Sequence, residues 1–130
     1  MAVKISGLNP FVVCFATLYL PADHGTLFEH KYEVHFKRLT TTQRDELNGK
    51  FVKGDITVRQ LLDEVVSGWA GMRNEEGSEV PYSPAERIAT DECYSGTEQS
   101  MGVAWFESAF VNQREAAIKN SKALSATTSE

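Results

Sequence analysis

The chain has 130 residues and a mass of 14.5 kDa, which is the size of one domain and leaves no room for two. Hydrophobic residues make up 42% of it, enough for one core, so a chain disordered over most of its length is excluded. The net charge of −5, without any cluster of lysine and arginine, argues against nucleic acid as a partner. No apolar run approaches the roughly 20 residues that span a bilayer, so we expect no membrane contact.

The N-terminal part predicts a β-hairpin. Residues 11–20 are aromatic, β-branched and apolar, which indicates a strand buried on both faces or nearly so. A turn around Gly25 follows. Residues 28–37 then alternate, with Phe28, His30, Tyr32, Val34 and Phe36 on one face and charged residues or His35 on the other. This pattern predicts an antiparallel strand with one wet side, and the hairpin must pack on helices or on another chain to be stable.

Helix signals follow along the chain. Thr40 to Thr42 can cap a short helix over residues 43–52. Thr57 and Gln60 form a capping-box pattern at the start of the next helix. Its apolar residues keep helical spacing as far as Trp69, so we expect one helix through that residue. The stripe consists of Val58, Leu61, Leu62, Val65, Val66 and Trp69.

The C-terminal half predicts two further helices. Ser83 as a cap and Pro84 at the first helical position predict a short helix to about Cys93. Thr97 is expected to cap a last helix over residues 98–119, and residues 121–130 are small and polar enough to be disordered. The predicted fold is therefore α+β: an N-terminal antiparallel β-hairpin packed on a bundle of about four helices, as a single domain over residues 1–120.

Motifs for catalysis or metal binding are missing from the sequence. It has no phosphate-binding loop, nucleophile elbow or zinc-type cluster, and Cys14 and Cys93 fit a reducing cytoplasm. His30 and His35 point to opposite faces of one strand, so they cannot jointly bind a metal. We expect no cofactor, no metal and no enzymatic activity, with an enzyme built on His30 or His35 as an alternative.

Aromatic residues are abundant for such short helices. The residues concerned are Trp69, Tyr82, Trp105, Phe106 and Phe110. At least three are expected in the core, and the surplus predicts an apolar surface for another chain. Our hypothesis is that Leu62, Val66 and Trp69 form most of the core. Trp105, Phe106 and Phe110 then lie at its edge and bind partners.

The order of these features resembles the tail assembly chaperones of long-tailed bacteriophages. The similar parts are residues 34–40, the segment 61–71 ending in Gly-Trp-Ala-Gly, the stretch 76–84 with Val-Pro-Tyr-Ser-Pro, and the last helix with Phe106 and Phe110. The resemblance covers about residues 28–120. Residues 88–96 depart from it because they lack the leucine-rich, proline-containing link of the family, and the first strand is unusually apolar.

The resemblance implies a non-enzymatic protein of the bacterial host cytoplasm. It would bind the phage tape measure protein, keep it soluble while tail tube subunits are recruited, and be absent from the mature virion. Association between copies of the chain is also considered. The alternatives are a structural tail or connector subunit whose hairpins pair between copies, and a small phage effector that binds a host protein.

Overall fold

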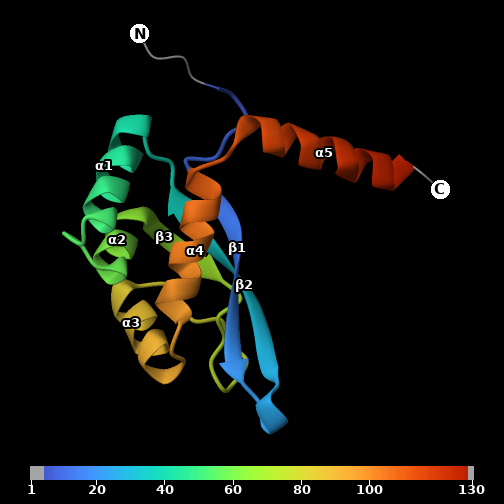
Figure 1. The fold of residues 1–130 in the computed structure, drawn as a ribbon. Coiled ribbons are helices and arrows are strands. Elements are labelled where there is room, and N and C mark those ends of the chain that lie inside the picture. The colour runs from blue at the N-terminus through green and yellow to red at the C-terminus, as the bar shows by residue number, and fades with distance from the viewer. Residues whose placement is uncertain (1–4, 129–130) are drawn as a thin grey trace.

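A computed structural model describes the backbone of residues 5–128 and the side chains of residues 5–121 (Figure 1). Its elements are β1 (Phe11–Pro21), the 3-10 turn η1 (Asp23–Gly25), β2 (Leu27–Lys37), α1 (Thr41–Val52), α2 (Val58–Val65), β3 (Val66–Ala70), α3 (Pro84–Cys93), α4 (Thr97–Ala109) and α5 (Gln113–Thr128). The predicted α+β class, with an N-terminal antiparallel hairpin packed on helices, is confirmed.

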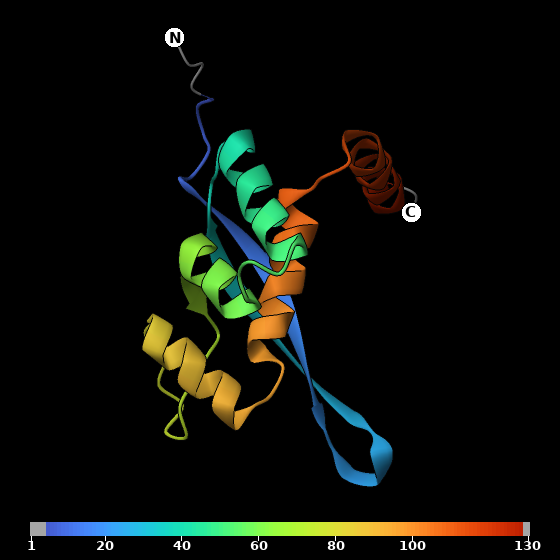
Figure 2. The ribbon, with the colours of Figure 1, turned by 60° about the vertical axis from the view of Figure 1, so that its left-hand side comes forward.

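The sheet has three antiparallel strands in the order β1-β2-β3. Thr17 pairs with Lys31 in the hairpin, and the tip of the hairpin projects from the body of the molecule (Figure 2). Even-numbered residues of β1 and β2 face the helices, and those in the middle of the strands, such as Leu18 and Val34, are buried. Odd-numbered residues lie on the other face, which we call the open face. The prediction that the first strand is buried on both faces was therefore wrong.

The predicted helix starts agree with the structure at three caps. Thr40 and Gln43 form a capping box at α1, and Thr57 and Gln60 form one at α2. The hydroxyl of Ser83 accepts a hydrogen bond from the backbone nitrogen of Glu86 at the start of α3. Each cap satisfies backbone N–H groups that the first helical turn leaves without a partner.

The second half of the expected helix through Trp69 is a strand instead. Helix α2 ends at Val65, and β3 pairs with β2, with Val34 opposite Trp69 and a register shift between His35 and Phe36. The shift places both Val66 and Trp69 on the helix side, so the strand buries the same residues that a helical stripe would bury. Gly68 permits the close pairing, because a Cβ there would lie 3.3 Å from Nδ1 of His35.

The expected last helix is broken between Ala109 and Gln113. The side-chain oxygen of Asn112 accepts a hydrogen bond from the backbone nitrogen of Glu115 and thereby starts a new helix, α5. Helix α5 projects away from the body of the molecule (Figure 1). The expected disorder from residue 121 differs from the structure, in which α5 continues to Thr128, and residues 129–130 lie outside the described part.

The core lies between the sheet and α4, which also contacts α2 and α3. Leu62, Val66 and Trp69 are buried in it as predicted, although two of them come from β3. Other members are Leu18, Tyr32, Val34, Phe36, Leu61, Val65, Met101 and Trp105.

Tyr32 is a buried tyrosine whose ionisation at alkaline pH destabilises the fold. Its hydroxyl lies 2.5 Å from Oγ of Ser100, and burial raises the pKa of Tyr32 to about 12 from the ordinary 10. The folded state then holds this proton more tightly than the unfolded state does. The contribution of Tyr32 to the free energy of unfolding is therefore complete below pH 10 and is lost as the pH rises through about 12.

We expect this effect to lower the free energy of unfolding by about 2–3 kcal/mol between pH 9 and 12. Urea unfolding of the wild type and of Tyr32→Phe across this range isolates it, because the two proteins share every other ionisable side chain. The phenylalanine variant should lose less stability over the range by that amount. Parallel curves for the two proteins would contradict this role of Tyr32.

Candidate protein-binding surfaces

The five aromatic residues predicted to bind partners lie in two separate groups. Trp69 and Tyr82 contact each other edge to face at 5.2 Å between ring centroids. Trp105 contacts Phe106 at 5.0 Å and Phe110 at 5.8 Å at the C-terminal end of α4. Trp69 and Trp105 are only 7% and 2% exposed, so both indoles are core residues. Phe106 is half-buried and Phe110 is 39% exposed.

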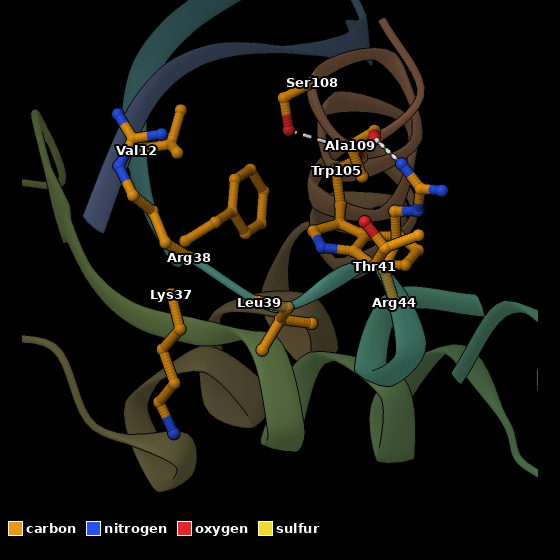
Figure 3. A pocket seen from close by; sticks show the side chains of 10 residues that line it. Val12, Lys37, Arg38, Leu39, Thr41, Arg44, Trp105, Ser108 and Ala109 are labelled. Atoms are coloured by element: carbon orange, nitrogen blue, oxygen red, sulfur yellow. Dashed lines mark hydrogen bonds between the residues drawn. The ribbon is translucent and has the colours of Figure 1, made fainter. Parts of the chain in front are cut away.

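The first hollow surface lies beside Trp105, and we call it the α4 pocket (Figure 3). It has a volume of about 250 Å³ and a mixed lining, in which Phe36, Leu39 and Trp105 lie among polar and basic side chains. Figure 3 shows the guanidinium groups of Arg38 and Arg44 on opposite sides of Trp105. No acidic side chain lines it, so it suits a partner that carries a carboxylate next to an apolar group.

Both arginines of the α4 pocket are fixed by bonds within the chain. Nε of Arg38 donates to the carbonyl oxygen of Asn9 at 2.7 Å. Arg44 donates to the carbonyl oxygen of Ala109 at 3.2 Å, forms an ion pair with Asp45, and lies 4.7 Å from the ring centroid of Phe110. Arg44 thus holds the last turn of α4 against α1, which gives it a structural role.

The second hollow surface lies between the hairpin and α3, and we call it the hairpin groove. Its volume is about 390 Å³, and most of its lining is apolar. Leu18, Leu20 and Phe28 line it from the hairpin, with Trp69, Met72, Val80 and Tyr94 from the other elements. Phe28 is 58% exposed and Tyr94 is also exposed, so large rings stand at the lips of the groove.

The floor of the hairpin groove is fixed by Trp69. Its indole Nε1 donates to the carbonyl oxygen of Val80 at 2.7 Å, which ties the loop after β3 to the sheet. Tyr82 packs against the indole edge to face, and its hydroxyl accepts a hydrogen bond from Arg87. Of the two aromatic residues predicted here, Trp69 therefore lines the groove, whereas Tyr82 only packs against the indole.

The exposed rings of the hairpin were not predicted from the sequence. Phe15 and Tyr19 lie on the open face, where Phe15 is 61% exposed. Their cross-strand neighbours on β2 are Glu33 and Glu29, and Nζ of Lys31 lies 4.6 Å from the ring centroid of Phe15. The sequence contained a signal for this exposure, because the second strand was predicted to have one polar, solvent-exposed face. Residues of the first strand that pair with that face must lie on the same side of the sheet.

A buried ionic network joins α2, α3 and α4 near Tyr82. Arg87 is fully buried, and it donates to Oε2 of Glu98 at 2.9 Å, to the hydroxyl of Tyr82 at 2.9 Å and to Asp63. Burial disfavours its charge, but the bonds to Asp63, Tyr82 and Glu98 outweigh burial and raise the pKa of Arg87. Arg59 also donates to Glu98, at 2.8 Å. Every charge is thus partnered within the fold, which makes the network structural.

The histidines lie apart from one another. His30 stacks on Tyr32 on the helix side of the sheet, and His35 stacks on Phe11 on the open face, at 5.8 and 5.2 Å between ring centroids. In the described part of the chain, no three His, Cys, Asp or Glu side chains converge as metal ligands. Within residues 5–128, no helix has the length and hydropathy needed to cross a membrane.

Comparison with protein-family models, curated proteins and solved structures finds no match to this chain.

Proposed function

We propose that this chain is a phage tail assembly chaperone, a non-enzymatic protein that binds the tape measure protein in the host cytoplasm. It would keep this long helical client soluble while tail tube protein subunits are recruited to it. The observation that supports this proposal is the hairpin groove, whose lining is apolar and whose lips carry the exposed rings of Phe28 and Tyr94. An amphipathic client helix docks its apolar face in a groove of this kind.

The hairpin groove suits this client better than the α4 pocket does. It is larger, at about 390 Å³ against 250 Å³, and its apolar lining continues onto exposed rings. The α4 pocket is flanked by two guanidinium groups, and its indole is buried. The net charge of −5 favours solubility of a complex that covers much apolar surface. Many copies along one long client would bind it with high avidity even where each contact is weak.

Replacing Phe28 with aspartate should strongly weaken client binding without unfolding the protein. The side chain is 58% exposed, so its loss costs the core little, while a carboxylate at the lip has to be desolvated against an apolar helix. We expect a loss of roughly 30-fold in affinity for the tape measure protein, the effect of about 2 kcal/mol at an interface hot spot. Co-expression with the tape measure protein, followed by measurement of its soluble fraction, tests this expectation.

Val52→Asp is the matched control, because Val52 is 74% exposed at the end of α1 and lines none of the described pockets. It should leave the soluble fraction unchanged. A third variant, Phe110→Asp, locates the contact. If Phe110→Asp loses the client while Phe28→Asp keeps it, the client binds at the end of α4 and the groove assignment is wrong. Presence of the chain in purified virions would contradict the chaperone proposal itself.

A further inference from the structure

Strand β1 forms one edge of the sheet, and its backbone groups on that side are free. The backbone nitrogen of Arg38 donates to the oxygen of Pro10, and that of Ala22 donates to the oxygen of Thr26. Both pairs continue the hairpin register, and bonded pairs alternate in an antiparallel ladder, so the even-numbered residues of β1 bond to β2. The odd-numbered residues direct their N–H and C=O groups away from β2. These residues are Phe11, Val13, Phe15, Thr17 and Tyr19.

This edge carries none of the features that usually prevent pairing with another strand. Within the described residues, none of its outward backbone groups bonds to another segment of the chain. The eleven residues of β1 include no charged residue, and its only proline, Pro21, is at the end. The opposite edge, β3, is five residues long and lies beside a bulge, which are common protections. The contrast within one sheet identifies β1 as the edge built for pairing.

Exposed surface flanks the free edge on both sides of the sheet, mixed polar and apolar on the helix side and aromatic on the open face. On the helix side, a groove of about 610 Å³ lies between residues 15–19 of β1 and the outer face of α4. Gln99, Val103 and Glu107 form that face of α4 at spacings of four residues, and Val103 is exposed. On the open face, the rings of Phe15 and Tyr19 are exposed next to the same edge.

We propose that the β1 edge binds the β1 edge of a second copy, giving a symmetric dimer with one continuous antiparallel sheet. Pairing a strand antiparallel with its own copy generates a two-fold axis, which is the commonest symmetry of protein dimers. An uncharged strand can do this without placing like charges opposite each other. This inference goes beyond the proposed function and does not depend on it.

The flanking surface also complements itself under this symmetry. The two-fold axis is perpendicular to the sheet, so the α4 helices of both copies lie on the same side and run antiparallel. The α4 faces that carry Gln99, Val103 and Glu107 then flank the seam from both copies, and a Gln99 amide can donate to a Glu107 carboxylate of the other copy. On the open face, Phe15 and Tyr19 add apolar area that edge pairing alone does not supply.

Thr17→Pro tests the edge directly, because it removes one outward N–H and leaves the bonds to β2 in place. Thr17→Val is its control, since it keeps the N–H and strengthens the strand. Sedimentation equilibrium at micromolar concentration should give twice the chain mass of 14.5 kDa for the wild type and for Thr17→Val. Thr17→Pro should sediment as a single chain. Circular dichroism and the thermal midpoint show whether each variant is folded.

Phe15→Lys provides a second route to the same result. The new ammonium group lies opposite Glu33 within the monomer, but in the dimer it places two like charges along one short seam of paired strands. It should also sediment as a single chain of 14.5 kDa. A single-chain wild type would overturn the proposal, as would a Thr17→Pro variant that stays dimeric. If the wild type is a single chain and Thr17→Pro loses the tape measure protein, the edge binds the client and the dimer is wrong. If Phe28→Asp alone loses the client, that result bears on the hairpin groove, and this variant should still sediment as a dimer.

Discussion

Replacing Arg87 with methionine should lower the free energy of unfolding by about 3–5 kcal/mol. Arg87 is fully buried and holds Glu98, which is 3% exposed, from the side opposite Arg59. Without the guanidinium, the buried carboxylate of Glu98 loses one of its two charged partners, and the hydroxyl of Tyr82 loses its donor. Urea unfolding followed by circular dichroism measures the loss.

The double variant Arg87→Met with Glu98→Met is the control for this interpretation. It removes both buried charges, while Asp63 and Arg59 remain solvated because their side chains are 48% and 44% exposed. The double variant should therefore regain a large part of the stability that Arg87→Met loses. If Arg87→Met alone stays within about 1 kcal/mol of the wild type, the network does not hold α2, α3 and α4 together.

Local signals predicted most elements of this fold correctly. The capping boxes at Thr40 and Thr57 and the Ser83-Pro84 start depend on residues three positions apart, and the structure forms all three caps. The alternation in the second strand also needs no tertiary information. Element types that follow from such short-range chemistry can be predicted from a single sequence.

Strand β3 depended on information that is not local, whereas the break before α5 has a local signal that was not used. Val66 and Trp69 have helical spacing, but β2 has a free side there, and a bulge lets a strand bury the same two residues. Tertiary pairing overrode the periodicity. At Phe110 the chain continues an apolar pattern, and only the Asn112 side chain marks a new helix start. That cap signal could have been found from the sequence.

The sequence correctly predicted exposed apolar surface but placed it on the wrong elements. We expected apolar surface for a partner on the last helix, yet Trp105 is in the core, and Phe15 and Phe28 of the hairpin are more exposed than Phe110. The first strand was interpreted alone, although its pairing with a one-sided strand requires its odd-numbered residues to be on the open face. The network of Asp63, Arg87 and Glu98 joins residues far apart in sequence, and no spacing rule identifies it.

Trp105→Ala should also lower the free energy of unfolding by about 3–5 kcal/mol, the usual cost of deleting a buried tryptophan side chain. The indole is 2% exposed and packs against Phe106 and Phe110, so its removal leaves a cavity under the last turns of α4.

Phe110→Ala is the matched comparison, because this ring is 39% exposed and should cost only roughly 1 kcal/mol. The two variants separate a core role from a partner-binding role at the same end of α4. A core residue changes the urea midpoint of the isolated protein, whereas a binding residue changes only the capture of the client. If Trp105→Ala keeps the wild-type midpoint and loses the tape measure protein, the indole serves the partner, and the packing of α4 against the sheet depends on its other buried residues.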